Sequence, residues 1–326
     1  MTAQSELKKR YGFSGSIKWL TRSSAFYPFI GLIVVTVFMS FMNEHFFTES
    51  NLINIARQVS IISIIAVGMT FAILTGGIDL SVGPVMALSG TIMAGLMVLG
   101  LPMELSILAG IGVGILFGFF NGFCIAVWAL PPIIVTLATM GIARGLALIY
   151  TGGYPLSGLP ESFSFFGRGT LFGVQTPIVI MLLVYLVAWV VLHKTPVGRY
   201  IYAIGGNEEA TRLSGVRVNR YKVLVYSISG CTAAISGLVL TSRLMSGQPN
   251  AGVAFELDAI AAVVIGGTAI AGGRGAIIGT LVGAMLLGVL NNGLNMIGMS
   301  PYAQTVIKGF IILVAIYIGR DRNIKK

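Results

Sequence analysis

Long apolar runs alternate with short polar breaks along almost the whole chain. Ten runs can be marked, at 25–42, 57–75, 81–99, 106–128, 132–150, 177–193, 222–242, 259–271, 276–297 and 302–319. A helix needs about 20 apolar residues to cross the hydrocarbon of a bilayer, and nearly all of the runs reach or approach that length. Helices in lipid are apolar on every face, so a missing 3.6-residue period does not argue against helix. The pattern predicts an all-α integral membrane protein.

The run at 259–271 is short, and its length alone favours a broken or re-entrant segment. The basic residues point instead to a crossing. They cluster in 1–24, in the connector 194–222 and in 320–326, and such clusters usually stay on the cytoplasmic side. Placing all three clusters there requires an even number of crossings between each pair. We therefore expect ten spanning helices with both termini in the cytoplasm.

Composition and charge agree with a chain embedded in a lipid bilayer. Apolar residues make up 56% of the 326 residues and charged residues only 10%, with a mean hydropathy of +0.90, whereas soluble domains carry about 25% charged residues. The net charge of +10 lies in blocks that flank the apolar runs, so it does not indicate a nucleic-acid partner. We expect a basic tail at 1–24, one transmembrane domain at 25–320 and a short tail at 321–326.

Glycines spaced four apart suggest close helix contacts and an internal repeat. The fourth run carries Gly110, Gly114, Gly118 and Gly122, and the ninth carries Gly275, Gly279 and Gly283. Such small residues let helix backbones touch. Gly118, Asn121 and Pro131 recur 170 residues later as Gly288, Asn291 and Pro301. An offset of five spans reverses orientation, so the pattern favours a 5+5 inverted repeat.

A glycine-broken stretch, Ile73 to Gly83 (ILTGGIDLSVG), lies between the second and third runs. Gly76 and Gly77 can end one helix, while Asp79 or Ser81 can cap the next. The stretch is then a tight helical hairpin at the cytoplasmic side. The alternative is a gate in a broken helix, whose freed backbone groups line a translocation pathway.

Side-chain amides on the two glycine-rich runs also have two interpretations. They are Asn121, Asn291, Asn292 and Asn295. Amides inside a membrane can hydrogen-bond between helices, or they can supply neutral donors and acceptors along a polar pathway.

The connector 194–222 is much longer than the other internal connections. Asn207 can cap a short helix that begins at Glu208-Glu209-Ala210, continues through Arg212-Leu213 and ends at Gly215. A capped helix on an otherwise small cytoplasmic face is a candidate contact for another protein, and a solvated connector is the alternative.

The external loops 151–176 and 243–258 mix charged and aromatic residues. The charged residues are Glu161, Arg168, Arg243, Glu256 and Asp258. A docking surface for an external protein would have this composition, and solvated loop faces are the alternative.

Signatures of chemistry are missing from the sequence. It contains no GxxxxGK[ST] phosphate loop, and it shows neither a nucleophile beside a base nor paired carboxylates on one face. We therefore expect a protein that is not an enzyme and holds no cofactor or metal of its own.

Four stretches together resemble a known family. Glu209-Ala210-Thr211-x-x-x-Gly215 resembles the Glu-Ala-Ala-x-x-x-Gly signature of ATP-binding-cassette importer permeases, with Thr211 at an Ala position and without the Leu-Pro of the fuller signature. GMTFAILTGGIDLSVG, GRYIYAIGGNEEATRLSGV and ELDAIAAVVIGGTAIAGGRGAIIGT resemble permeases for ribose and related monosaccharides. The likeness runs from about residue 46 to 320.

The resemblance implies partners, a location and residue roles. Such permeases work in the bacterial inner membrane as a pair of chains, here a homodimer, with a cytoplasmic ATPase that binds ATP and Mg²⁺ and a periplasmic sugar-binding protein. Glu208 to Gly215 would lie on the ATPase, the Asp79 stretch beside the pathway, and the Glu256 region near the binding protein. Ribose is the favoured sugar. A stand-alone secondary transporter or facilitator is the alternative, weakened because the spans offer no carboxylate to carry a coupling proton.

Overall fold

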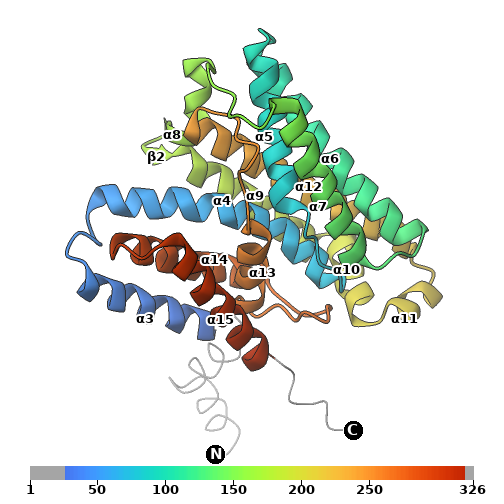
Figure 1. The fold of residues 1–326 in the computed structure, drawn as a ribbon. Coiled ribbons are helices and arrows are strands. Elements are labelled where there is room, and N and C mark those ends of the chain that lie inside the picture. The colour runs from blue at the N-terminus through green and yellow to red at the C-terminus, as the bar shows by residue number, and fades with distance from the viewer. Residues whose placement is uncertain (1–25, 320–326) are drawn as a thin grey trace, which may run out of the picture.

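The computed structural model describes residues 26–319, and most of them are helical (Figure 1). The helices that correspond to the ten apolar runs are α3 (Phe26–Met42), α4 (Glu49–Leu74), α5 (Val82–Val98), α6 (Met103–Val127), α7 (Pro132–Thr151), α9 (Thr176–Lys194), α12 (Val218–Leu244), α13 (Phe255–Ile265), α14 (Ile277–Met296) and α15 (Pro301–Gly319). Six of them, α4, α6, α7, α9, α12 and α14, are long and apolar enough to cross a membrane, and α3 and α5 are shorter apolar helices. The prediction of an all-α membrane protein is confirmed.

The two long connectors hold small elements of their own. Between α7 and α9 lie the 3-10 helix η1 (Glu161–Ser164), α8 (Phe165–Arg168) and the antiparallel pair β1 (Thr170–Leu171) and β2 (Val174–Gln175). Between α9 and α12 lie α10 (Pro196–Gly206) and α11 (Glu208–Leu213). The sequence predicted α11, from its cap and its terminating glycine, but it predicted neither α10 nor the β-pair.

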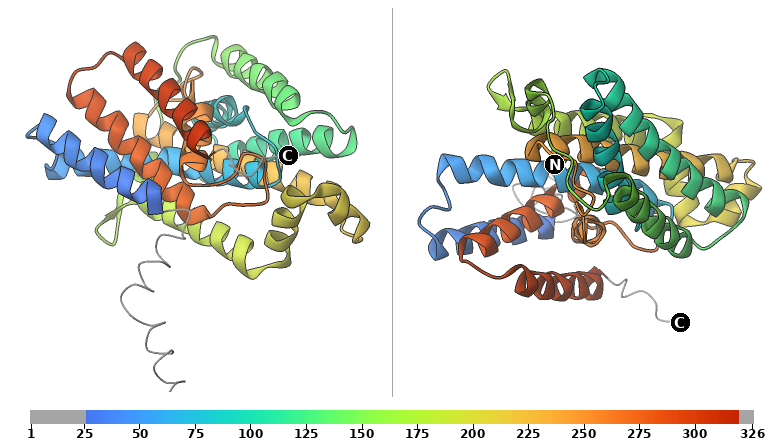
Figure 2. Two further views of the ribbon diagram at one scale, coloured as in Figure 1. Left: turned by 90° about the horizontal axis from the view of Figure 1, so that it is seen from below. Right: turned by 45° about the horizontal axis from the view of Figure 1, so that its top comes forward.

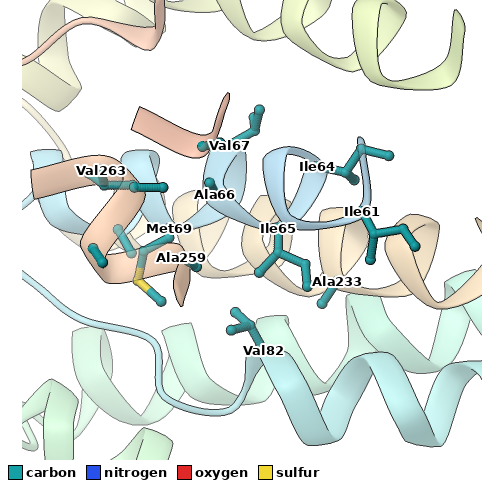
Figure 3. Close-up of a cluster of buried hydrophobic side chains, with 14 of the residues drawn as sticks. Ile61, Ile64, Ile65, Ala66, Val67, Met69, Val82, Ala233, Ala259 and Val263 are labelled. Atoms are coloured by element: carbon teal, nitrogen blue, oxygen red, sulfur yellow. The ribbon is translucent and has the colours of Figure 1, made fainter. Parts of the chain in front are cut away.

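Helix α4 is the centre of the packing. Every residue from Val59 to Leu74 is buried, and α4 packs against α9, α12, α13 and α14. Figure 3 shows its isoleucines beside Val82 of α5, Ala233 of α12 and Ala259 of α13. The helix begins at Glu49, ahead of the apolar run predicted at 57–75, because the polar residues before that run are helical too. A helix that is apolar on all faces can be surrounded in this way.

The glycine-spaced runs form backbone contacts, as predicted. A Cβ atom on Gly118 of α6 would lie 2.1 Å from the carbonyl oxygen of Tyr226 in α12. A Cβ atom on Gly283 of α14 would likewise lie 2.1 Å from the carbonyl oxygen of Ala262 in α13. These helix pairs can approach so closely only because no side chain separates them. Helix α14 also lies along α3, as both views of Figure 2 show.

Helix α13 differs from the predicted run at 259–271. It starts at Phe255, where two acidic residues occupy the first turn and favour a helix N-terminus, and it ends at Ile265. The remainder of the run belongs to a glycine-rich loop, 266–276. Eleven residues make a helix about 16 Å long at a rise of about 1.5 Å per residue. Because the hydrocarbon core is about 30 Å thick, α13 does not cross it alone.

Candidate functional site

The glycine-broken stretch between α4 and α5 is enclosed by other helices. Helix α4 ends at Leu74, and Gly76 follows with a left-handed φ of +80°. Ser81 stands at the N-cap position of α5, but its side chain makes no capping hydrogen bond. Capping by Ser81 is therefore wrong: Ser81 has helical dihedral angles, φ −79° and ψ −12°, whereas a capping residue is extended. Of the two predicted residues, it is Asp79 whose side chain accepts from a backbone N–H at the start of α5, that of Ser81.

The Asp79 carboxylate lies at the centre of this stretch and is only 1% exposed. Its Oδ1 accepts hydrogen bonds from the backbone N–H of Ser81 at 3.0 Å and from the Ser81 hydroxyl at 2.6 Å. Its Oδ2 accepts one from the Ser229 hydroxyl of α12 at 2.7 Å. A buried carboxylate is tolerated when its oxygens are hydrogen-bonded. The partners are all neutral, so the site is a polar cluster within an apolar bundle.

Two further helices, α6 and α7, and a second residue of α12 hold the same stretch. Asn121 of α6 donates to the Ser81 hydroxyl at 2.9 Å, and Thr136 of α7 donates to the carbonyl oxygen of Ile78 at 3.2 Å. The Tyr226 hydroxyl of α12 covers Gly77 so closely that a Cβ atom there would lie 2.2 Å from it. Because Gly77 has no side chain, the Tyr226 hydroxyl can lie directly against the backbone of this stretch.

The structure brings together only part of the predicted pathway set. Gly76, Gly77, Asp79, Ser81 and Asn121 meet, whereas the α14 amides lie elsewhere. Asn292 donates to Asn51 at the start of α4 at 2.9 Å, and Asn295 accepts from Gln304 at 2.7 Å. Asn291 is buried on the same part of α14. The 26 residues of α4, about 39 Å of helix, separate these amides from Asp79.

The loop before α13 is fastened against the start of α5. A Cβ atom on Gly83 would lie 2.4 Å from the carbonyl oxygen of Gly252 and 2.7 Å from Glu256 Oε2. Arg144 of α7 donates to the carbonyl oxygens of Pro249 and Ala251, the latter at 2.9 Å. The buried Glu256 therefore lies beside the N-terminus of α5, where the helix dipole favours a carboxylate.

The predicted docking residues divide into two groups. Glu256 and Asp258 are buried in α13, and Asp258 pairs with Lys308 of α15 at 2.9 Å. The expectation that both acids lie on an exposed loop is wrong, because the loop ends at Ala254 and both belong to a packed helix. Glu161 and Arg168 are exposed. Arg168 Nε donates to the carbonyl oxygen of Arg243 at 2.7 Å, which brings the two arginines together.

The connector helix α11 is built as the sequence predicted. The Asn207 side chain accepts from the N–H of Ala210 at 2.9 Å, and Gly215 follows the helix with φ +83°. Glu208 pairs with Arg212 at 2.9 Å. It also pairs with Lys222 of α12 at 2.6 Å, which ties α11 to a long helix. This second pair could not be predicted from sequence spacing, because Glu208 and Lys222 lie in different helices.

Acid is expected to loosen α11. Burial raises the pKa of Glu208, but hydrogen bonds and charge from Lys222 and Arg212 outweigh it and hold the pKa below its usual 4.5. Because the pKa of Glu208 is lower in the folded than in the unfolded state, the charged carboxylate stabilises α11 at pH values above the unfolded pKa. This stabilisation is lost as the pH falls through the folded pKa. Amide hydrogen exchange across 208–214 should therefore accelerate below about pH 4.5 after correction for intrinsic rates. Glu208→Gln should abolish this dependence; an unchanged acid response in that variant would contradict the assignment.

The bundle, with a polar cluster buried among apolar helices, defines a multi-pass membrane protein. Comparison with known proteins then places it. The family described as "Branched-chain amino acid transport system / permease component" matches residues 51–316. The chain belongs to this family of transport permeases, and it is a multi-pass protein of the inner membrane.

Several relatives are similar over nearly their whole length. The chain is 48% identical to the ribose import permease protein of Bacillus subtilis (strain 168) over 318 residues, which cover 97% of each protein. It is 48% identical to that of Haemophilus influenzae over 302 residues, 91% of this chain and 94% of the relative. It is 45% identical to that of Escherichia coli (strain K12) over 327 residues, 99% of this chain and 100% of the relative. No solved structure matches.

Proposed function

We propose that this chain is the membrane-spanning subunit of an importer that carries a monosaccharide, with ribose as the first candidate, and that a partner ATPase supplies the energy. The observation that carries the proposal is the identity of 45–48% to ribose import permease proteins over almost the entire chain. The site is compatible with a neutral sugar, since the Asp79 cluster offers hydroxyls and amides as hydrogen-bond partners. The chain's own role would be to open and close a path.

The proposal assigns α11 to the ATPase. Glu208, Glu209, Ala210, Arg212, Leu213 and Gly215 would form the contact. The exposure of this helix to solvent supports the assignment. The exposed side chains are those of Glu209, Ala210, Arg212 and Leu213, and the Asn207 cap fixes the start of the helix. Leu213 in particular is 81% exposed, and such an apolar side chain gains stability when a partner covers it. ATP and Mg²⁺ would be bound by the partner.

On the external side, a sugar-binding protein would dock on the part of the predicted set that remains accessible. Glu161, Arg168 and Arg243 carry this role, with the half-buried Arg243 held beside Arg168. Glu256 and Asp258 would act from inside, by fixing α13 below the docked protein. A second copy of the chain completes the proposed assembly, with both termini of each copy in the cytoplasm.

We also propose the ten-span arrangement and the inverted repeat, with α3 to α7 equivalent to α9, α12, α13, α14 and α15. The packing of the inner helices supports this correspondence. Helix α6 packs on α12, and its equivalent α14 packs on α4. Helix α5 contacts α6, α7 and α12, and its equivalent α13 contacts the matching helices α14, α15 and α4. The outer helices α3 and α9 do not follow this correspondence. Helix α3 packs on α14, whose equivalent is α6, but α9 packs on α4. Short α13 would then complete its crossing with the loops at its two ends.

Uptake of labelled ribose into proteoliposomes tests the proposed function. We expect accumulation only when the chain is combined with its ATPase, its binding protein and ATP. Ribose entry through the chain alone, down a gradient, would favour the stand-alone facilitator instead. Accumulation by the chain alone under a proton gradient would point to a secondary transporter in which the buried Asp79 carries the proton. A panel of pentoses and hexoses then identifies the sugar.

A further inference from the structure

Helix α10 contacts the end of α4 and the loop 266–276 directly through main-chain atoms. A Cβ atom on Gly205 would lie 1.8 Å from the carbonyl oxygen of Leu74 and 2.4 Å from the nitrogen of Gly273. The N–H of Gly273 donates to that same Leu74 oxygen at 3.0 Å. We call Leu74, Gly205 and Gly273 the glycine junction. Three segments far apart in sequence meet here without any side chain between them.

The junction lies between the two functional parts of the chain. On one side, α10 is followed at once by Asn207, which caps α11. On the other side, Leu74 leads into Gly76 and the Asp79 stretch, and a Cβ atom on Gly272 would lie 2.8 Å from the nitrogen of Gly76. A single short helix, α10, therefore connects α11 to the Asp79 stretch.

A second contact fastens α10 to the same loop. The Tyr202 hydroxyl donates to the carbonyl oxygen of Gly275 at 3.0 Å. The loop joins α13 to α14, so α10 is connected to both of these helices as well as to α4. Main-chain contacts of this kind transmit displacement well, because a side chain can yield by rotating whereas a packed backbone cannot.

We propose that the glycine junction transmits the displacement of α11 to the Asp79 stretch, and that Gly205 is a positioning residue for transport. This inference rests on the proposed function, in which α11 contacts the ATPase. An added methyl group at position 205 must push α10 away from Leu74 and disturb the Gly273 hydrogen bond. The ATPase would still bind α11, but its movement would no longer reach the pathway.

The neighbouring glycine supplies a matched control. Gly206 is exposed, lies in the same helix, and has nothing within 4 Å of an added Cβ atom. Gly205→Ala and Gly206→Ala add the same methyl group and make the same change in intrinsic helix propensity. Any difference between the two variants therefore reports the contact with Leu74 and Gly273.

The test compares these variants in the assembled complex, reconstituted with ATPase and binding protein. Gly205→Ala should lower both labelled-ribose uptake and the stimulation of ATP hydrolysis by ribose-loaded binding protein on the order of tenfold. Basal ATP hydrolysis and co-purification of the ATPase should stay at the wild-type level, which a loss of folding would not allow. Gly206→Ala should match the wild type in every readout.

Tyr202→Phe keeps the inference testable if Gly205→Ala does not fold. It removes one hydrogen bond and keeps the ring. It should lower the stimulated hydrolysis about threefold, while the protein stays folded with a denaturation midpoint only slightly below that of the wild type. Wild-type stimulation in Tyr202→Phe, or in a folded Gly205→Ala, would overturn the role of the junction. A wild-type complex without any ribose-stimulated hydrolysis would overturn the proposed function itself, so the two failures are distinguishable.

Discussion

Gly230→Leu is expected to lower the free energy of unfolding by at least about 3 kcal/mol, at the upper end of what overpacking costs. Helices α6 and α12 are in backbone contact here, and a Cβ atom on Gly230 would lie 2.0 Å from the carbonyl oxygen of Gly114. The reciprocal atom on Gly114 would lie 2.4 Å from the carbonyl oxygen of Gly230. The obstacle is backbone on both sides, so the helices must separate. Denaturation of the purified protein in detergent micelles measures the effect.

Gly112→Leu is the matched control for this prediction. Gly112 lies in α6, two residues before Gly114, and an added Cβ atom there has nothing within 4 Å. The substitution adds the same side chain to an open face, and its leucine has a better helix propensity than glycine. We expect a stability equal to or above that of the wild type. If both leucine variants lost stability equally, contact between α6 and α12 would not be the cause.

The fold was largely predictable from the sequence because a bilayer constrains it strongly. Each apolar run contains a helix, although the helix in the run at 259–271 ends at Ile265, and the glycine spacing correctly indicated which helix surfaces touch. The boundaries of α4 and α13 were less predictable. Polar residues before Val59 and acidic residues before Ala259 extend both helices beyond their apolar runs, and hydropathy alone does not register such extensions.

The site was only partly predictable, for a physical reason. Gly76, Asp79 and Ser81 stand out because a charge beside paired glycines interrupts an apolar chain. Their partners Ser229 and Tyr226 lie in a helix about 150 residues later, and the sequence around them resembles any other small-residue surface. Asn291 and Asn292 looked equivalent to Asn121, yet they face the other end of α4. Residue type indicates the kind of contact, whereas the tertiary fold decides which residues meet.

Asp79→Ala is expected to lower the free energy of unfolding by roughly 3 kcal/mol, because three buried donors lose their acceptor and each unpaired buried group costs about 1 kcal/mol or more. The donors are the backbone N–H and hydroxyl of Ser81 and the hydroxyl of Ser229. The stretch they hold would no longer keep its place between α6 and α12. We therefore expect ribose uptake by the assembled complex to be lost as well. Denaturation in micelles and labelled-ribose uptake measure the two effects.

Two variants show whether these hydrogen bonds are the cause. Asp79→Asn retains one acceptor oxygen for Ser81 and offers an amide to Ser229, whose hydroxyl can rotate to accept it, so stability and most of the uptake should return. Ser89→Ala removes a buried hydroxyl of α5 that has no hydrogen-bond partner in the part of the chain described here, and it should change stability little. An Asp79→Ala protein as stable as Ser89→Ala would show that the cluster does not hold the stretch. An Asp79→Asn protein that is stable but inactive would instead assign transport to the negative charge, and Asp79 would then act in the pathway rather than only fastening it.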